Sequence, residues 1–280
     1  MNQMLIQSLT GVGFPALFVL VLSALCFWLF KEHPRLRGTG IGLITAAGIF
    51  WAYDFASGGI TYPPRETTDW LPYIAVVGAL VGCIRFWMWR HFWGAALSLG
   101  TALTLFGYQI NGNAGAVLWT LGVTLVLAVS ATLLQLIEDR CSGAELSLGL
   151  AVAAGSGGIA MFLSGSAVLG QIAGAVGLML SGIAILAFFA NATVGSVLPF
   201  IYVFAFGSLL LEGCLLAGLP WISGVLLWIA PWTLLFGKRT ERPKLLSRIL
   251  ALGLRMIGVV VLVCAALAVV FLLVQPSADY

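Results

Sequence analysis

Residues 145–182 read ELSLGLAVAAGSGGIAMFLSGSAVLGQIAGAVGLMLSG, and the only charged residue among them is the first, Glu145. An α-helix rises about 1.5 Å per residue, so roughly 20 apolar residues cross a hydrocarbon core about 30 Å thick. This stretch and its flanks hold two runs of that length, Ala144–Leu163 and Ala167–Ala190, joined by Ser164-Gly165-Ser166. We therefore predict two adjacent membrane-spanning helices.

Small residues crowd both runs and include Gly170, Gly174 and Gly177. Bare helix faces let two backbones approach closely and gain van der Waals contact in lipid, where no hydrophobic drive brings helices together. We expect these two helices to be central and tightly packed. The alternative is a glycine hinge or an unwound segment at Gly155–Gly158, of the kind found in the broken helices of transporters.

The composition of the whole chain extends this interpretation. Of its 280 residues, 61% are hydrophobic and 8% are charged, and the mean hydropathy is +1.09. One water-soluble core cannot hold that much apolar surface, so the lipid bilayer is the expected surroundings of the protein. The net charge of +3 is small and comes from scattered residues, which argues against a nucleic-acid partner.

Residues typical of metal, cofactor or catalytic sites are scarce. The five cysteines form no CxxC pair, and both histidines lie in basic segments at the ends of apolar runs, so we expect no metal and no cofactor. The sequence has no Walker loop and no HExxH or GxSxG motif, which favours a protein without catalytic activity. A lipid-modifying enzyme is kept as a third functional alternative.

Ten apolar runs of spanning length divide the chain, and we predict an all-α, polytopic membrane bundle. The predicted spans are Phe14–Phe30, Gly38–Ser57, Trp70–Trp89, Phe92–Gln109, Ala114–Ile137, Ala144–Leu163, Ala167–Ala190, Val194–Leu216, Leu219–Phe236 and Ile249–Val274. We treat 1–280 as one transmembrane domain, although two halves of five spans, 1–140 and 141–280, would be related as an inverted repeat. At the short connections 164–166 and 216–219, re-entrant half-helices are the alternative to full spans.

Basic residues support this count, because cytoplasmic loops retain Lys and Arg while short translocated loops do not. With ten spans and an outside N-terminus, only Arg65 lies on the outer side. The inner side then receives Lys31, Arg35, Arg37, Arg85, Arg90, Arg140, Lys238, Arg239, Arg242, Lys244, Arg248 and Arg255. We therefore predict that both termini lie outside the cytoplasm and that the protein resides in the plasma (inner) membrane.

Five ionisable residues are predicted to gather on the outer side. A charge inside a bilayer costs about 2.5 kcal/mol or more, so Asp54 in the second span and Glu212 in the eighth both need a reason to be there. Together with Arg65, Glu66 and Asp69 of the only sizeable outer loop, they could form a polar pocket that binds a substrate or an ion.

The outer loop also has a purely structural interpretation. Tyr62-Pro63-Pro64 predicts a stiff, extended segment, because proline fixes its own φ and restricts its predecessor. Asp69 would cap the third span, and Arg65 would neutralise a neighbouring carboxylate.

The last span begins with a basic stripe. Lys244, Arg248 and Arg255 are separated by four and seven residues, which places them along one face of a helix. We predict that this stripe contacts the inner leaflet, where it would bind an anionic lipid or a partner protein. Ordinary charges that set the topology are the alternative.

Two functional hypotheses follow. The first is a transporter or permease for a small solute or ion, because each half of the chain places a carboxylate, Asp54 or Glu212, at a similar depth in the outer half of the bilayer. The second is a non-catalytic membrane subunit that scaffolds or anchors a larger complex of membrane subunits, because buried charge is sparse and a soluble domain is lacking.

Overall fold

Helices are the only regular elements in the residues that the computed structural model describes, which are 9–84, 87–106, 114–236 and 245–274. In chain order the elements are the π turn η1 (Leu9–Gly13), α2 (Phe14–Leu29), α3 (Pro34–Ser57), the 3-10 turn η2 (Thr68–Trp70), α4 (Leu71–Gly82), α5 (Trp87–Phe106), α6 (Ala114–Arg140), α7 (Gly143–Leu163), α8 (Ala167–Ala190), α9 (Val197–Ile201), the π turn η4 (Tyr202–Phe206), α10 (Gly207–Leu216), α11 (Trp221–Ile229), the 3-10 segment η5 (Ala230–Phe236) and α12 (Leu245–Leu273).

The prediction of an all-helical protein is confirmed for the described residues, and each predicted span falls on a helix or on consecutive helical elements. Seven described helices are long and apolar enough to cross a membrane, whereas the apolar helices over Thr68–Gly82 and Trp221–Phe236 are shorter. The largest difference concerns the third predicted span, since α4 ends at Gly82 and Trp87 already belongs to α5. Interfacial tryptophans fit the end of one helix as well as the start of the next, so their positions alone could not place this boundary.

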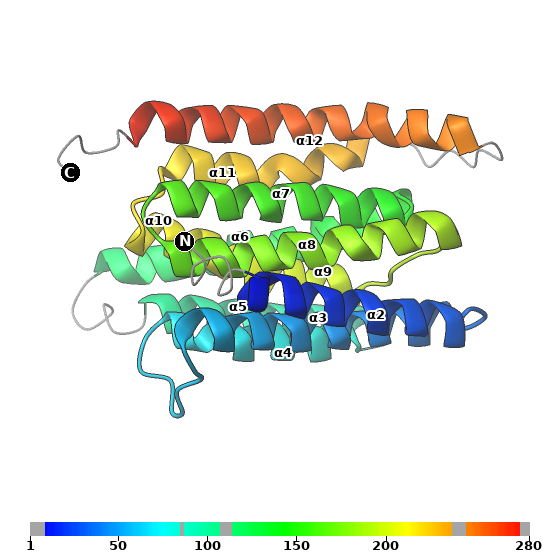
Figure 1. The fold of residues 1–280 in the computed structure, drawn as a ribbon. Helices are drawn as coiled ribbons and strands as arrows, with labels where there is room; N and C mark the ends of the chain where they lie inside the picture. The colour runs from blue at the N-terminus through cyan, green and yellow to red at the C-terminus, as the bar shows by residue number, and fades with distance from the viewer. Residues whose placement is uncertain (1–8, 85–86, 107–113, 237–244, 275–280) are drawn as a thin grey trace.

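Successive helices run in alternating directions, so the chain turns at two opposite ends of the bundle (Figure 1). One end, which we name the basic end, carries Lys31, Arg35, Arg37, Arg90 and Arg140 in the described part of the chain. The other end, which we name the loop end, carries the connection from Gly58 to Thr67. Arg65 lies in that connection, so these described basic residues are sorted between the two ends as the sequence predicts. Arg85, Lys238, Arg239, Arg242 and Lys244 lie outside the described residues.

The helices α7 and α8 pack against each other along their length. A Cβ atom added to Gly158 would lie 2.7 Å from the backbone nitrogen of Gly174, and one added to Gly177 would lie 2.7 Å from the Cα atom of Gly155. The predicted close approach of these two helices is therefore confirmed. Residues 155–158 lie inside the uninterrupted helix α7, so the alternative of an unwound segment is wrong.

The most buried of the seven described helices long enough to cross a membrane is the continuous helical run α9–η4–α10, from Val197 to Leu216. Every residue from Val197 to Leu210 is buried, because α3, α4 and α6 pack around its first half and α8 and α11 contact its second half. Its middle is the π turn η4, a local widening of the helix that is often found at functional sites. We name this run the central helix.

Candidate functional site

The loop at the loop end folds around the buried carboxylate of Asp69. Its Oδ1 accepts a hydrogen bond of 2.6 Å from the hydroxyl of Tyr53 on α3. Its Oδ2 accepts hydrogen bonds from the backbone N–H groups of Arg65, at 2.9 Å, and Glu66, at 3.1 Å. The side chains of Arg65 and Glu66 are exposed. Asp69 therefore anchors the loop to α3 through two backbone donors and one buried hydroxyl.

This arrangement differs from the helix cap expected at Asp69. The Trp70 position that precedes α4 has no side-chain cap hydrogen bond, because the Asp69 carboxylate turns back toward the loop. Burial alone would raise the pKa of Asp69, but hydrogen bonds from Thr61, Tyr53 and two backbone N–H groups outweigh burial and hold this pKa well below its usual value. Asp69 is thus a fixed negative charge beside the start of α4.

Removing this carboxylate is expected to release the loop. Asp69→Ala loses three hydrogen bonds to an ionised group, each worth roughly 1.5–3 kcal/mol, so the peptide bond after Arg65 should be cut by trypsin at least about tenfold faster than in the wild-type protein. Because the pKa of Asp69 is depressed, the protection is complete above the ordinary pKa of aspartate and is lost only when the pH falls through the lower value. Limited proteolysis followed by mass spectrometry measures this rate.

A matched control for this experiment is Glu66→Gln, which changes an exposed carboxylate of the same loop and leaves the backbone N–H of residue 66 in place. Trypsin should cleave this variant at the wild-type rate, since exposed substitutions usually change stability by less than about 0.5 kcal/mol. Equal cleavage of the Asp69→Ala variant and the wild-type protein would contradict the anchoring role of Asp69.

Glu212 is a buried carboxyl group of the central helix. Its side chain is 1% exposed, and its Oε2 has no hydrogen-bond partner among the described residues. Asp69 precedes α4 and Glu212 lies about one turn before the end of α10, so both belong to the loop end of the bundle. A buried carboxyl group has to be neutralised by a proton or by a bound cation.

The other residues predicted for the outer pocket are Asp54, Arg65 and Glu66. Asp54 is half-buried on α3, and its backbone carbonyl accepts hydrogen bonds from the N–H groups of Gly58 and Gly59 where the helix ends. Consecutive residues of an α-helix point about 100° apart, so the side chain of Asp54 points away from the direction in which Tyr53 reaches Asp69. The structure places Asp69 and Glu212 at the same end of the bundle, and one shared pocket and a binding role of the five residues stay predictions.

A polar cavity of about 450 Å³ lies at the basic end. It is lined by residues from the start of α3, the ends of α4 and α6, the start of α5 and the segment before the central helix, among them Arg35, Arg90, Glu138 and Ser196. Arg90 and Glu138 are half-buried, and the Nε of Arg90 has no hydrogen-bond partner among the described residues. Guanidinium groups around a cavity of this kind favour a small anionic ligand.

Close backbone contacts form one wall of this cavity. A Cβ atom on Gly38 would lie 2.8 Å from the Cα atom of Gly195. Arg37 does not line the cavity. Its guanidinium donates hydrogen bonds to the carbonyls of Lys31, at 3.4 Å, and Thr193, at 3.2 Å, and lies 5.4 Å from the ring centroid of Phe27. The start of α3 and the segment before the central helix are thus held together beside the cavity.

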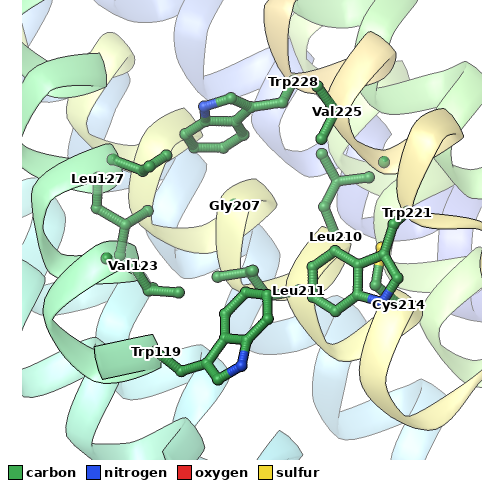
Figure 2. Close-up of a pocket in the computed structure, with 13 residues that line it drawn as sticks. Trp119, Val123, Leu127, Gly207, Leu210, Leu211, Cys214, Trp221, Val225 and Trp228 are labelled. Atoms are coloured by element: carbon green, nitrogen blue, oxygen red, sulfur yellow. The ribbon is translucent and has the colours of Figure 1, made fainter. Parts of the chain in front are cut away.

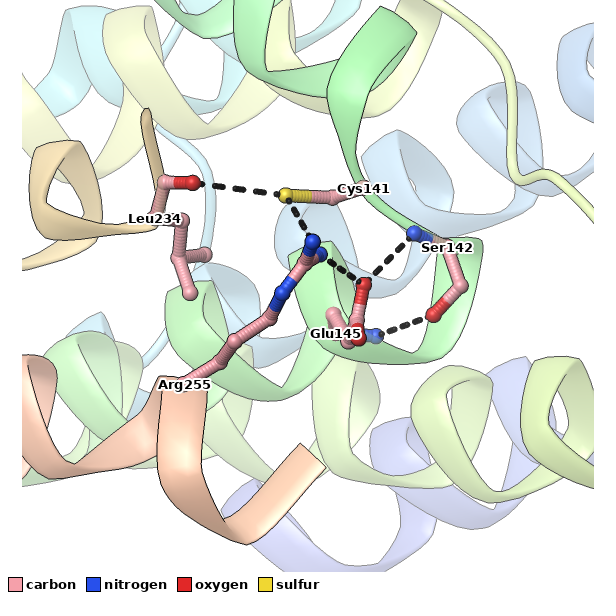
Figure 3. Close-up of polar contacts among 5 residues, drawn as sticks. All are labelled: Cys141, Ser142, Glu145, Leu234 and Arg255. Carbon is pink, nitrogen blue, oxygen red and sulfur yellow. Dashed lines mark hydrogen bonds and ion pairs between the residues drawn. The ribbon is translucent and has the colours of Figure 1, made fainter. Parts of the chain in front are cut away.

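Arg255, one of the three residues predicted to contact the inner leaflet, forms an ion pair inside the protein (Figure 3). Its Nη1 lies 2.6 Å from Oε2 of Glu145, and the two side chains are 11% and 12% exposed. Glu145 also forms a capping box with Ser142 at the start of α7, so the pair ties α12 to α7. Lys244 lies outside the described residues, and nothing is described of the Arg248 side chain; lipid or partner contact by this stripe stays a prediction.

Sequence reasoning missed two groups of residues. The sequence does contain a signal for Tyr53, because a tyrosine buried in an apolar helix needs a hydrogen-bond partner for its hydroxyl. Tyr202 on the central helix gives the same signal, but its hydroxyl has no partner among the described residues. The sequence marks Arg35 and Arg90 only as topology signals, and nothing in the spacing of these two arginines and Glu138 predicts that the three line one cavity.

The described residues hold no group of three or more His, Cys, Asp or Glu side chains placed to bind a metal ion. No protein-family model matches the chain, and no curated protein matches its sequence.

Proposed function

We propose that the protein is an integral membrane carrier that moves a small solute or ion across the plasma (inner) membrane. The arginines of the basic-end cavity favour an anionic solute, and Glu212 takes up the proton or cation that accompanies it. Ten crossings, with both termini outside the cytoplasm, complete the proposal. It is supported by the basic residues, because the end of the bundle that collects them is expected to face the cytoplasm.

One observation carries this proposal. A polar cavity lies at the start of the central helix, where Val197 and the preceding Ser196 line its wall. Near the other end of this helix lies the buried carboxyl group of Glu212, whose Oε2 has no hydrogen-bond partner among the described residues. Both polar features therefore adjoin the helix that is most enclosed by protein. A protein with only a structural role gains nothing from a buried carboxyl oxygen without a partner there, since burying it is costly.

Uptake into liposomes tests the proposal. Purified protein is reconstituted, and the entry of radiolabelled inorganic phosphate and of radiolabelled succinate is measured with the outside acidified. We expect entry of at least one of these anions above the level of protein-free liposomes, and Glu212→Gln should reduce it to that level because the amide cannot exchange a proton. Glu32→Gln, which changes an exposed carboxylate between α2 and α3, should transport like the wild-type protein.

Two results would overturn the proposal. The first is transport by the Glu212→Gln variant at the wild-type rate. The second is entry of neither anion, together with co-purification of a stoichiometric set of other membrane subunits in mild detergent, which would favour the scaffolding alternative.

A further inference from the structure

A second cavity lies on the side of the bundle, between α6 and α11, and has a volume of about 380 Å³ (Figure 2). The central helix forms its floor at Gly207 and Leu210, and glycines at Gly122 and Gly224 leave its two walls open. We name it the lateral slot. Neither Asp69 nor Glu212 lines it, and it shares no lining residue with the basic-end cavity.

The lateral slot offers almost nothing to a polar ligand. Its lining consists of aliphatic side chains, glycines, one cysteine and three tryptophans. The indole N–H of Trp228, which also lines the lateral slot, already donates a hydrogen bond of 3.0 Å to the hydroxyl of Ser130. Water or a charged solute would find too few partners there, so the lateral slot is no part of a solute route.

The mouth of the lateral slot faces the surroundings of the bundle. Trp119 on α6 is 56% exposed, and Val126 on α6 and Val225 on α11 are each 50% exposed. The helix that carries Trp119 and Val126 is long and apolar enough to span a membrane. In a bilayer, this mouth therefore opens into the hydrocarbon chains rather than into water.

The length of the lateral slot matches one leaflet. Its lining runs on α6 from Trp119 to Leu127 and on α11 from Trp221 to Trp228, which at about 1.5 Å per residue is roughly 10–12 Å. A transmembrane helix of a partner needs a groove along the whole core of about 30 Å, whereas the chain of a lipid occupies one half of it. The size thus favours a lipid chain over a partner helix.

The loop end of the lateral slot is framed by a pair of indoles. Trp119 and Trp221 stack with ring centroids 5.6 Å apart, and they lie near the starts of α6 and α11. Tryptophans at such positions sit at the level of the lipid head groups, where an indole N–H can donate to an ester carbonyl. We infer that the lateral slot holds one acyl chain of a phospholipid from the loop-end leaflet, with its ester region beside Trp119 and Trp221.

Native mass spectrometry of the detergent-purified protein with added phosphatidylethanolamine tests this inference. The wild-type protein should keep one phospholipid at collision energies that remove all others. Gly122→Leu should lose that adduct, because a Cβ atom at this position meets no heavy atom within 4 Å and the leucine side chain extends into the lateral slot. Val225→Trp fills the lateral slot from the other wall and should also abolish the adduct. Either variant can therefore test the inference if the other does not fold.

Gly100→Leu is the matched control, because Gly100 on α5 is also a helical, exposed glycine with open space around its Cβ position but lies outside the lateral slot. It should keep the lipid as the wild-type protein does. The inference is overturned if the wild-type protein keeps no phospholipid, or if both slot-filling variants keep it. It is also overturned if the wild-type protein is a dimer that the slot-filling substitutions convert to monomers.

Discussion

Gly158→Ala is expected to lower the free energy of unfolding by about 3 kcal/mol, whereas Gly155→Ala, three residues earlier on the same helix, should leave it unchanged or raise it slightly. The Cβ atom at position 158 would lie 2.7 Å from the backbone nitrogen of Gly174 and 2.8 Å from the carbonyl oxygen of Gly170. Backbone atoms of α8 cannot rotate away as a flexible side chain could, so α7 and α8 have to separate, and overpacking of this kind costs about 1–3 kcal/mol or more.

Gly155 is a sharp control for this change. Its own Cβ position meets no heavy atom within 4 Å, and alanine is favoured over glycine inside a helix by roughly 0.5–1 kcal/mol. Unfolding by sodium dodecyl sulfate in mixed micelles, followed by tryptophan fluorescence, compares the two variants directly. If Gly158→Ala were as stable as Gly155→Ala, the close contact of α7 and α8 would be wrong.

Arg255→Met is expected to destabilise the protein by about 3 kcal/mol, because it leaves the nearly buried carboxylate of Glu145 without its cationic partner. The second change Glu145→Gln should recover part of this loss, since glutamine removes the unpaired charge and still completes a capping box with Ser142. The double variant should therefore be more stable than Arg255→Met alone, which a double-mutant cycle in the same unfolding titration measures.

Arg140→Met provides the comparison for this cycle. Arg140 is an exposed arginine at the end of α6, and its replacement should change stability by less than about 0.5 kcal/mol. An equally small effect of Arg255→Met would contradict the role of the Arg255–Glu145 pair in joining α12 to α7.

The sequence predicts the helices well because length and hydropathy are local properties. Residues 167–190, for example, form α8 with the predicted bounds. The tight packing of α7 and α8 was also predictable, since Gly170, Gly174 and Gly177 expose the backbone along one helix. Hydropathy could not show that the central helix is more enclosed by protein than α7 or α8. A helix in lipid is apolar both on the faces that contact lipid and on the faces that contact protein.

The candidate site was predictable only in part. Asp69 and Glu212 stand out as acidic residues at the same predicted side, and the structure places both at the loop end. The partner of Asp69, Tyr53, lies 16 residues away on another helix, and no local pattern encodes that contact. The basic-end cavity depends on the packing of five chain segments, so Arg35 and Arg90 could be recognised as cations but not as neighbours.

The proposed topology puts the basic end and the loop end on opposite faces of one membrane, with the basic end toward the cytoplasm. Arg65→Cys at the loop end and Arg35→Cys at the basic end, each in a background without the five native cysteines, test this topology with a membrane-impermeant maleimide. We expect the thiol at position 65 to be labelled in intact cells, and the thiol at position 35 to be labelled only after permeabilisation. Labelling of both thiols in intact cells would contradict it.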